Sequence, residues 1–385
     1  MVTTILILLF IIPVLLIFHS YVIYPFTLLV TERKSRPAMR VEKKALPKVS
    51  VLVSAYNEES NIKAKIQNLL QLEFPQDRLE IVIGVDGATD KTYEVASAFS
   101  GRNLIVINFP VRRGKIAVLN DLVAKSNGEI LIFTDADVEL DKLSVMNLIT
   151  HFDNERIGGA CGRYVLRPKE MVNGPDVELT YWIMENWIKK LEGGRGVVLG
   201  ANGGAYSIRK NHFIPFEPQV PIADDFILPL KIIEAGYDFV YEPKALAYGK
   251  SASFPDEFKR KIRIGAQDFN GLRIVRPLLN PSRGFVSYAL WSHKVLRWFV
   301  PHLLLLAFAS NALLASHFRF FYFTMQMQVL FYVAAIIGSV SLLLKLDIPI
   351  LSQIGYFVSA NAALFVGFIK SIFKGQGTKW EVSRS

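Results

Sequence analysis

An apolar run that ends in two aspartates is the feature of this sequence with the clearest chemical meaning. The stretch ILIFTDADVELD covers residues 130–141 and places Asp135 and Asp137 one residue apart, directly after the apolar residues. If the backbone is extended there, side chains at i and i+2 point to the same side. Two such carboxylates suit a hard divalent cation, Mg²⁺ or Mn²⁺, held against substrate phosphates. A surface turn with solvated acids is the alternative, and the preceding apolar run favours the metal site.

Two other apolar runs also end in polar residues. VSVLVSAY continues into NEES, which includes Glu58, and LEIVIGVD ends at Asp86, four residues before Asp90. In open parallel sheets, ligands bind beyond the carboxyl ends of the strands. A single Asp, Asn or Ser at such a place is often only a helix cap or a turn residue. Acids at three strand ends together indicate a binding site.

The segment from residue 49 to about 250 contains the elements that would position these strand ends. Apolar runs of strand length alternate with amphipathic helical patterns such as NIKAKIQNLLQL, DKTYEVASAF and GKIAVLNDLVAKS. The runs are apolar throughout, which is typical of parallel strands covered by helices on both faces. The sequence therefore predicts an α/β domain with a Rossmann-like, mostly parallel sheet.

Both ends of the chain are apolar enough for a membrane. The sequence is 51% hydrophobic with a mean hydropathy of +0.30, more than a soluble globule requires. Residues 1–30 are an uncharged run of spanning length, and the basic linker 31–47 indicates that the domain after it is cytosolic. Residues 294–373 contain about three more such segments, before a basic tail at 374–385. Four full spans would place that tail outside, whereas its charge favours the inside, so one segment is expected to be re-entrant or interfacial.

Charge and cysteine content limit the classes of binding partner and of metal or disulfide site that the protein can have. The chain has 44 Lys and Arg against 34 Asp and Glu, a net charge of +10. The basic residues within 256–293 suit amphipathic, interfacial helices on anionic membrane lipid. No nucleic-acid recognition motif is present, so nucleic acid is not expected as a partner. The single cysteine, Cys161, lies in a predicted buried strand, which excludes a disulfide framework and a thiolate metal site.

Six motifs occur in the order seen in one enzyme family. They are VSVLVSAYNEE, VDGATDKT, GKIAVLN, FTDADVELD, LGANGGAYSIRK and IADDFILPLKIIEAGY. In this order they resemble family 2 glycosyltransferases, inverting enzymes of GT-A fold that include membrane-bound poly-N-acetylglucosamine, hyaluronan and cellulose synthases. The resemblance implies a GT-A catalytic domain over residues 48–255, flanked by the transmembrane helices.

The resemblance also implies how a UDP-sugar donor is bound. Asp86 is similar to the residue that binds the base, and Lys115 to a lysine near the base and diphosphate. Asp135 and Asp137 resemble the paired acids that hold Mg²⁺ or Mn²⁺, with Asp135 also counted among the nucleotide-binding residues. The residues expected around uracil and ribose are Ala55, Tyr56 and Glu58.

An inverting transfer also needs a general base. The acceptor hydroxyl must lose its proton as it attacks the anomeric carbon from the face opposite the diphosphate. IADDF places Asp224 and Asp225 at the start of a predicted helix, where either acid alone would be interpreted as a helix cap. Asp225 matches the second acid of the family's T-E-D motif. The resemblance therefore assigns Asp225 as the base and Asp224 as its support.

Two further segments are expected near the acceptor and the leaving diphosphate. Glycines permit close approach of backbone to a ligand, and the resemblance places a glycine-rich loop at the acceptor: Gly200, Ala201, Asn202, Gly203 and Gly204. Processive members carry Q-x-x-R-W on an interfacial helix, whereas here Arg260 replaces the glutamine, Arg263 is kept and Ile264 replaces the tryptophan. Arginines there suit phosphate oxygens or, alternatively, lipid headgroups. A later KVLRW at the edge of a membrane segment resembles the same pattern.

These inferences lead to one expected function and two alternatives. We expect a metal-dependent inverting hexosyltransferase that moves a sugar from a UDP-sugar, with UDP-GlcNAc and UDP-Glc as candidate donors, to a polysaccharide or lipid-linked acceptor. It would be a multi-pass protein of the plasma (inner) membrane with a cytosolic catalytic domain. The alternatives are a non-catalytic nucleotide-binding subunit of a polysaccharide assembly complex and a nucleotidyltransferase, which also uses paired acids. No sequence pattern indicates an oligomeric state.

Overall fold

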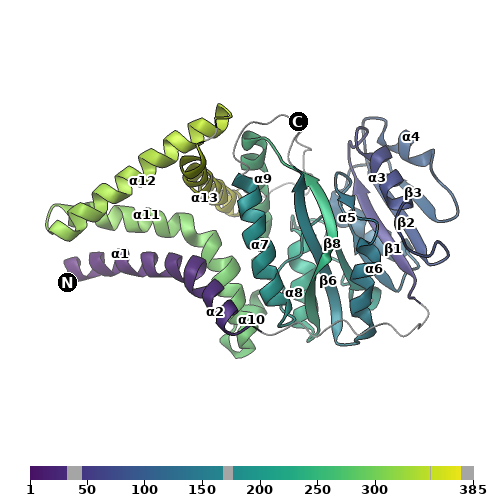
Figure 1. Ribbon diagram of the computed structural model, residues 1–385, viewed down its shortest axis with the longest axis horizontal. Helices are drawn as coiled ribbons and strands as arrows, with labels where there is room; N and C mark the ends of the chain where they lie inside the picture. The colour runs from purple at the N-terminus through teal and green to yellow at the C-terminus, as the bar shows by residue number, and fades with distance from the viewer. Residues whose placement is uncertain (33–45, 168–176, 347, 374–385) are drawn as a thin grey trace.

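A computed structural model describes residues 1–32, 46–167, 177–346 and 348–373. A sheet domain lies at one end and helices α1, α11, α12 and α13 lie at the other, with α7 and α9 between them (Figure 1). The strands are β1 Val49–Ala55, β2 Leu79–Asp86, β3 Leu104–Phe109, β4 Ile130–Phe133, β5 Glu139–Leu140, β6 Ile157–Arg167, β7 Tyr206–Arg209 and β8 Asp238–Lys250. They form one sheet in the order β3-β2-β1-β4-β7-β6-β8-β5.

The sheet has a parallel half and a mixed half. Strands β3, β2, β1 and β4 run parallel to one another, as the alternation of strand and helix patterns predicted. Strand β7 is antiparallel to both β4 and β6, β8 is parallel to β6, and the short edge strand β5 is antiparallel to β8. The α/β class is confirmed, and the antiparallel pairings make the sheet mixed.

Both faces of the parallel half are buried. Along β1, Val51 and Val53 belong to the hydrophobic core on one face, and Leu52 belongs to the core on the other. Since helices cover both faces, apolar residues occupy positions on both sides of the strand, and Ser50 and Ser54 are its polar residues. Cys161 is fully buried in β6, where burial raises the pKa of its thiol to about 12 and leaves it unreactive at neutral pH.

Helices connect and cover the strands. Those of the sheet domain are α3 Ile62–Leu70, α4 Thr92–Ser97, α5 Lys115–Lys125, α6 Ser144–Ile149, α7 Val177–Gly193, α8 Asp224–Glu234 and α9 Phe254–Ile274. The carboxyl ends of β1, β2 and β4 lead into the loops that precede α3, α4 and β5, respectively. Because the three strands are parallel neighbours, those loops meet at one edge of the sheet.

Among the described residues, four helical stretches are long and apolar enough to cross a membrane: Val2–Val30, Phe285–Ala315, Arg319–Leu343 and Pro349–Phe373. The first contains α1 Val2–Phe18, the π-helical η1 His19–Ile23 and α2 Tyr24–Val30; the second contains α10 Phe285–Ala289, the π-helical η6 Leu290–Val295 and α11 Leu296–Ala315; the others are α12 and α13. The second stretch begins at Phe285, ahead of the boundary expected at 294. The basic tail at 374–385 and most of the linker at 31–47 lie outside the described residues.

Helix α9 packs closely on α13. A Cβ at Gly265 of α9 would lie 3.1 Å from the Leu364 side chain, and one at Gly367 of α13 would lie 2.7 Å from the carbonyl oxygen of Ile262. Glycine at both positions therefore lets the two backbones approach. This contact joins the sheet domain directly to a candidate membrane helix.

Candidate active site

Lys115 connects the two predicted acidic motifs. It is the first residue of α5, and its Nζ lies 2.9 Å from Oδ1 of Asp135 and 3.0 Å from Oδ1 of Asp224. Burial would lower the pKa of this ammonium, but the charges of Asp135, Asp224 and Asp225 outweigh burial and raise it. The sheet edge and the start of α8 therefore face one shared cleft.

The loop that carries Asp135 and Asp137 is held in a turn. The sequence predicted an extended backbone at this place, whereas Ala136 and Asp137 form a turn between β4 and β5. The buried Lys65 of α3 donates to Thr134 Oγ1 at 2.7 Å and to the carbonyl oxygen of Val138 at 2.6 Å. Lys65 thus anchors both ends of the loop. A turn, rather than the expected extended backbone, brings Asp135 and Asp137 near each other.

Like charges crowd this part of the cleft. Burial, followed by the charges of Asp137 and Asp135, raises the pKa of Glu58 to about 7. Asp137 is exposed, yet the surrounding protein and the charge of Asp135 raise the pKa of its carboxyl as well. Mutual repulsion of carboxylates is relieved by a bound cation.

These acids fit a Mg²⁺ or Mn²⁺ site of the open kind. Within the described chain, no group of three or more His, Cys, Asp or Glu side chains forms a closed ligand set. Mg²⁺ commonly binds through one or two carboxylates and takes its other ligands from water and substrate phosphates. Asp135 and Asp137 match that donor set, and the raised pKa of Asp137 is consistent with it.

At the carboxyl end of β2, Asp86 shapes a loop. Its two carboxylate oxygens accept from the backbone N–H groups of Arg113 and Gly114, both at 2.7 Å. This pins the turn that leads into Lys115. Nearby, the guanidinium of Arg112 lies 3.6 Å from the centre of the Tyr56 ring. Ala55 is the buried last residue of β1, so Ala55, Tyr56, Glu58 and Asp86 do lie at neighbouring strand ends.

Asp224 and Asp225 begin α8 as predicted, but neither caps it. The N-cap residue is Ala223, without a side-chain hydrogen bond. The Asp224 carboxylate instead accepts from the buried Tyr206 hydroxyl at 2.6 Å and pairs with Lys115. Burial, followed by the charge of Asp224, raises the pKa of Asp225 to about 6. A carboxylate with a pKa near neutrality is suited to general base catalysis.

The glycine-rich loop approaches both acidic motifs. The N–H of Ala201 donates to the carbonyl oxygen of Asp225 at 2.7 Å, and the N–H of Asp135 donates to the carbonyl oxygen of Gly203 at 3.0 Å. A Cβ at Gly203 would lie 2.2 Å from Oδ2 of Asp135. Any residue other than glycine at position 203 would therefore displace the Asp135 carboxylate. The Asn202 side chain donates to Gly162 and accepts from Ala205, so it holds the loop in shape.

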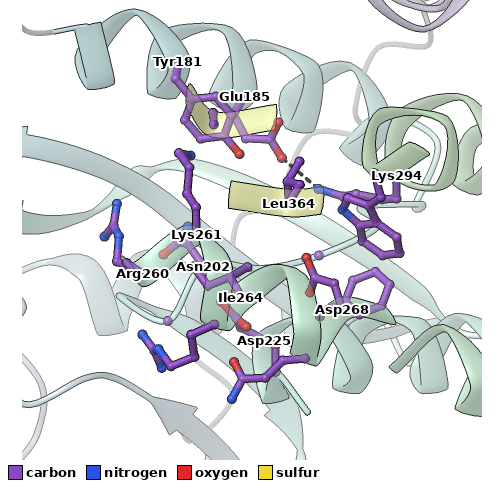
Figure 2. A pocket seen from close by; sticks show the side chains of 18 of the residues that line it. Tyr181, Glu185, Asn202, Asp225, Arg260, Lys261, Ile264, Asp268, Lys294 and Leu364 are labelled. Carbon is purple, nitrogen blue, oxygen red and sulfur yellow. Dashed lines mark hydrogen bonds and ion pairs between the residues drawn. The ribbon is translucent and has the colours of Figure 1, made fainter. Parts of the chain in front are cut away.

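A cavity of about 560 Å³ extends from this cleft towards the long apolar helices (Figure 2). Its lining includes Asp135, Asp224, Asp225, Lys115, Gly200, Ala201, Asn202, Gly203, Gly204, Arg260 and Arg263. It also includes Lys294, Arg297 and Trp298 of the KVLRW segment. The two arginine-containing patterns of the sequence, RKIRI and KVLRW, thus border one cavity. Arg260 is paired with Glu178 and Glu257.

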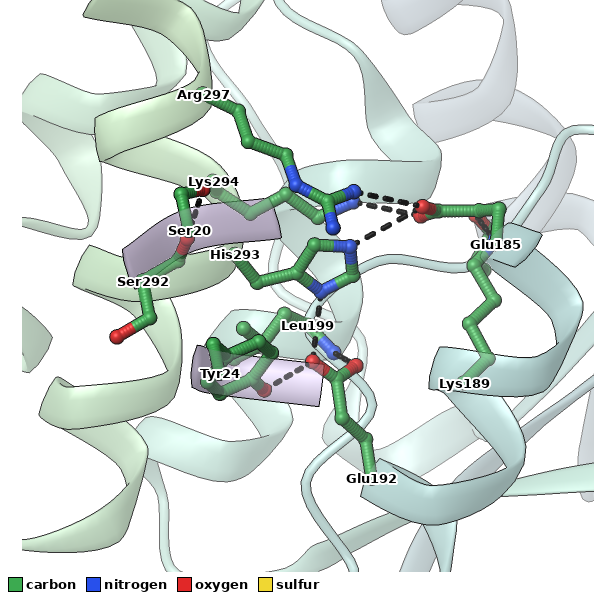
Figure 3. A network of polar contacts seen from close by, with 11 residues as sticks. Ser20, Tyr24, Glu185, Lys189, Glu192, Leu199, Ser292, His293, Lys294 and Arg297 are labelled. Carbon is green, nitrogen blue, oxygen red and sulfur yellow. Dashed lines mark hydrogen bonds and ion pairs between the residues drawn. The ribbon is translucent and has the colours of Figure 1, made fainter. Parts of the chain in front are cut away.

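A buried ionic network joins α7 to the first two long apolar stretches, Val2–Val30 and Phe285–Ala315 (Figure 3). Glu192 accepts from the Tyr24 hydroxyl at 2.6 Å and lies 2.7 Å from Nδ1 of His293. Glu185 contacts Nε2 of His293 at 3.1 Å and Lys294 Nζ at 3.0 Å. Lys189, on the same helix, donates to the carbonyl oxygen of Ala201 at 2.8 Å. One helix therefore connects the membrane segments to the glycine-rich loop.

Sequence reasoning did not find Lys65, Arg112 or Lys189. The first had a readable signal, because Lys65 occupies the apolar stripe of α3 with Ile62, Ile66 and Leu69. A lysine in such a stripe needs buried acceptors. Arg112 and Lys189 lie in basic or mixed segments where spacing does not single them out, and their contacts are long-range.

The chain folds into an α/β domain of the GT-A type, attached to long apolar helices. Residues 50–213 match the family model described as glycosyl transferase family 2. The chain therefore carries a family 2 glycosyltransferase domain, which confirms the resemblance found in the motifs.

Curated relatives match over the same region. The probable glycosyltransferase YdaM of Bacillus subtilis is 28% identical over 61% of this chain and 58% of its own length. A poly-beta-1,6-N-acetyl-D-glucosamine synthase of Staphylococcus epidermidis is 26% identical over 52% of this chain and 49% of its own. A beta-monoglucosyldiacylglycerol synthase of Nostoc is 32% identical over 30% of this chain and 25% of its own. The matched part of the chain thus spans less than two thirds of each relative.

A solved structure resembles the chain over nearly its whole length. It is a mannosyltransferase from Pyrobaculum calidifontis in complex with GDP-Man and Mn²⁺, with a TM-score of 0.71 and 19% identity. The match covers 96% of this chain and 100% of the other. The sheet domain and its apolar helices therefore share one fold with that protein.

Proposed function

We propose that the protein is an inverting glycosyltransferase that moves a sugar from a UDP-sugar to a polysaccharide or lipid-linked acceptor at a membrane. The observation that carries this proposal is the meeting of Asp135 and Asp225 in one cavity, connected through Lys115 and Asp224. In this proposal the diphosphate binds near Asp135, Asp225 acts as the general base, and the sugar occupies the cavity between them.

The nucleotide would bind along the carboxyl ends of β1, β2 and β4. Tyr56 and the Asp86 loop border the place of the base and ribose, and Lys115 lies between them and Asp135. A buried ammonium there attracts the diphosphate. Arg263 also lines the cavity, and its guanidinium would stabilise the same anion.

In the reaction, the acceptor oxygen forms a bond to the anomeric carbon of the donor sugar while the bond from that carbon to the diphosphate oxygen breaks. The acceptor proton passes to the Asp225 carboxylate, and the electron pair of the broken bond leaves with the nucleoside diphosphate. Asp224 is held by Tyr206 and Lys115 and fixes the start of α8, which positions Asp225.

Asp135 and Asp137 would hold Mg²⁺ or Mn²⁺. When bound, the metal ion supplies Lewis-acid neutralisation of the leaving diphosphate. The similar mannosyltransferase structure contains Mn²⁺ and a nucleotide-diphosphate sugar, GDP-Man, which supports a divalent metal and widens the donors to be tested.

The four long apolar helices support a multi-pass protein. We place it in the plasma (inner) membrane with the sheet domain in the cytosol, where nucleotide-sugars are made. An arrangement of this kind restricts the enzyme to acceptors at the membrane surface and raises their effective concentration.

The test is a nucleotide-release assay with full-length protein in lipid vesicles. UDP-GlcNAc, UDP-Glc and GDP-Man are offered with Mg²⁺ or Mn²⁺, and release of intact UDP or GDP is measured together with sugar incorporation. Asp225→Asn is expected to bind the nucleotide normally and to lose about 100- to 10,000-fold in turnover. Equal loss of binding and turnover would remove Asp225 from the base role. Incorporation of the α-phosphate would instead show nucleotidyl transfer.

A further inference from the structure

One arginine on the cavity wall has hydrogen-bond donors that the protein does not use. Arg297 of α11 borders the cavity and is only 9% exposed. Its Nε and Nη2 atoms are buried and have no hydrogen-bond partner within the described part of the chain. These two atoms carry more than half of the N–H groups of the guanidinium. Buried donors are rarely left unpaired, so these donors indicate a missing ligand.

The ion pair that Arg297 does form is a weak one. Its Nη1 lies 3.6 Å from Oε2 of Glu185, which is too long for a hydrogen bond. Both oxygens of that carboxylate have closer partners: Oε1 lies 3.0 Å from Nζ of Lys294, and Oε2 lies 3.1 Å from Nε2 of His293. One face of the guanidinium is covered by the Tyr21 ring, whose centre lies 5.0 Å from Cζ. Glu185 therefore neutralises Lys294 more fully than it neutralises Arg297.

The charges around Arg297 favour an anionic ligand. Lys294 and Arg297 share the single carboxylate of Glu185. Asp268 of α9 also borders the cavity and lies between Lys294 and Asp225 in Figure 2. Burial raises the pKa of its carboxyl to about 8, so at neutral pH it is mostly protonated and can donate to an anion. A phosphate group has the charge and the acceptor oxygens that match the unpaired fork of a guanidinium.

The position of Arg297 links the reaction centre to the apolar helices. On the side of the reaction centre, a Cβ at Gly200 would lie 3.9 Å from Cε of Lys294 and 3.8 Å from the carbonyl oxygen of Asp225. Arg297 itself belongs to the long apolar stretch Phe285–Ala315, and α13 lines the same cavity. Charged residues within membrane helices typically face a substrate path. A ligand of Arg297 therefore borders both the glycine-rich loop and segments apolar enough for the bilayer.

We propose that the inner end of the cavity is a phosphate-binding site, in which Arg297 and Lys294 bind the phosphate group of an anionic membrane lipid. The apolar chains of the lipid would lie towards α13, and a hydroxyl of its headgroup would face Asp225. The lipid is then the sugar acceptor, so the proposal rests on the proposed glycosyltransferase function and adds a phosphate to the acceptor as a requirement. Uncharged glycolipids and soluble glycans lack the group that Arg297 binds.

The first test measures binding and needs no turnover. Full-length protein in a nonionic detergent is titrated with dihexanoyl phosphatidylglycerol or with dihexanoylglycerol, which lacks the phosphate. Tryptophan fluorescence is the signal, because Trp182 and Trp298 border the cavity. The phosphate-bearing lipid is expected to bind about tenfold or more tightly than the uncharged one, since charge-assisted hydrogen bonds form. Equal affinities would overturn the proposal.

Variants of Arg297 test which residue provides this preference. Arg297→Gln is expected to abolish the preference for the phosphate-bearing lipid, and Arg297→Lys is expected to retain part of it, because an ammonium keeps the charge without the fork. Arg273→Gln removes an exposed arginine of α9 and should bind both lipids as the wild type does. An undiminished preference in Arg297→Gln would contradict the proposal.

A second pair of variants leaves Arg297 in place. Tyr21→Glu puts a carboxylate where the ring now lies beside the guanidinium, whereas Tyr21→Gln puts an uncharged side chain of the same size there. Only Tyr21→Glu is expected to abolish the preference, because the new carboxylate competes with the phosphate for Arg297. Equal affinities for the phosphate-bearing lipid in these two variants would overturn the proposal, and this test holds even if Arg297→Gln does not fold.

Competition separates the possible sources of the phosphate. Inorganic phosphate and UDP with Mn²⁺ are offered to the wild-type protein and to Arg297→Gln. Both proteins should bind UDP equally, and inorganic phosphate should displace the lipid only weakly. An equal loss of UDP affinity in Arg297→Gln would assign Arg297 to the donor, and tight binding of inorganic phosphate would assign it to a soluble ligand; either result overturns the lipid site. Failure to release a nucleoside diphosphate from any donor would instead remove the proposed function, whatever the lipid titrations show.

Discussion

The protein contains two clusters of ionisable side chains that are built in opposite ways. In the cleft at the sheet edge, Glu58, Asp135 and Asp137 are like charges, and the pKa values of Glu58 and Asp137 are raised. At the junction of α7 with the membrane helices, Glu185 and Glu192 are surrounded by donors and cations. Burial would raise the pKa of Glu185, but Lys294 and His293 outweigh burial and hold it well below its usual range.

This difference indicates that the ionisable residues of the junction stabilise the fold, whereas those of the cleft serve in binding. Charges in the junction are compensated within the chain, so removing one leaves its partner buried and unpaired, at a cost in stability. Charges in the cleft are compensated only in part: Asp135 pairs with Lys115, whereas burial and the neighbouring acids raise the pKa values of Glu58 and Asp137. The remaining repulsion costs stability in the free protein and is relieved by a cation or substrate. Variants of the junction should therefore lower stability, whereas variants of the cleft should lower activity.

The junction should give the largest change in stability. Glu192 is fully buried and bonds both Tyr24 and His293. Glu192→Ala is expected to lower the free energy of unfolding by about 3 kcal/mol, because two buried partners lose their acceptor. Thermal or denaturant unfolding of the protein in detergent checks this. A stability equal to the wild type would show that the network is dispensable and would remove the contrast.

The cleft should show the opposite behaviour. Asp137→Asn is expected to lower turnover about a hundredfold, because neutralisation of the diphosphate charge depends on the metal site. Its stability should be unchanged or slightly higher, since repulsion with Asp135 is removed. Asp77→Asn, at a side chain that is 82% exposed, is the control. A large loss of stability in Asp137→Asn would mean that the cleft acids are structural.

A glycine pair tests whether the position of one carboxylate matters. Gly203→Ala would push the Asp135 carboxylate, because the added Cβ would lie 2.2 Å from its oxygen. We expect about a tenfold loss of turnover, since small displacements of a metal-binding group are costly. Gly101→Ala has no atom nearer than 4.0 Å to its Cβ and should behave as the wild type. Steady-state kinetics at several Mn²⁺ concentrations compare the two.

The pH dependence gives the smallest effect near neutrality. The base must be deprotonated, and the pKa of Asp225 is raised to about 6. Turnover should therefore be near its plateau at pH 7 and above, and should fall about tenfold for each pH unit below 6. The measurement is kcat at saturating donor and acceptor between about pH 5 and 8. A flat profile across this range would assign the proton transfer to another group.

Much of the fold was readable because it depends on local patterns. Continuous apolar runs such as that of β4 identify strands buried on both faces, and the buried stripe of α3 identifies a helix. The antiparallel insertion of β7 between β4 and β6 was not readable, because it pairs segments far apart in sequence. The start of the second long apolar stretch was expected at residue 294, whereas it lies at Phe285. The π-helical segment of this stretch contains the polar residues His293 and Lys294, which are buried by contacts with Glu185 from a distant part of the sequence.

The sequence by itself determined the order of strands and helices, the presence of long apolar helices and the acids that follow three strands, since each depends on neighbouring residues. It did not determine which charges find partners. Asp224 became a partner of Lys115, Arg260 was paired with Glu178 and Glu257, and Asp268 was left facing a cavity. Electrostatic compensation acts through space, so only the tertiary structure decided which charged groups stabilise the protein and which face the cleft and its cavity.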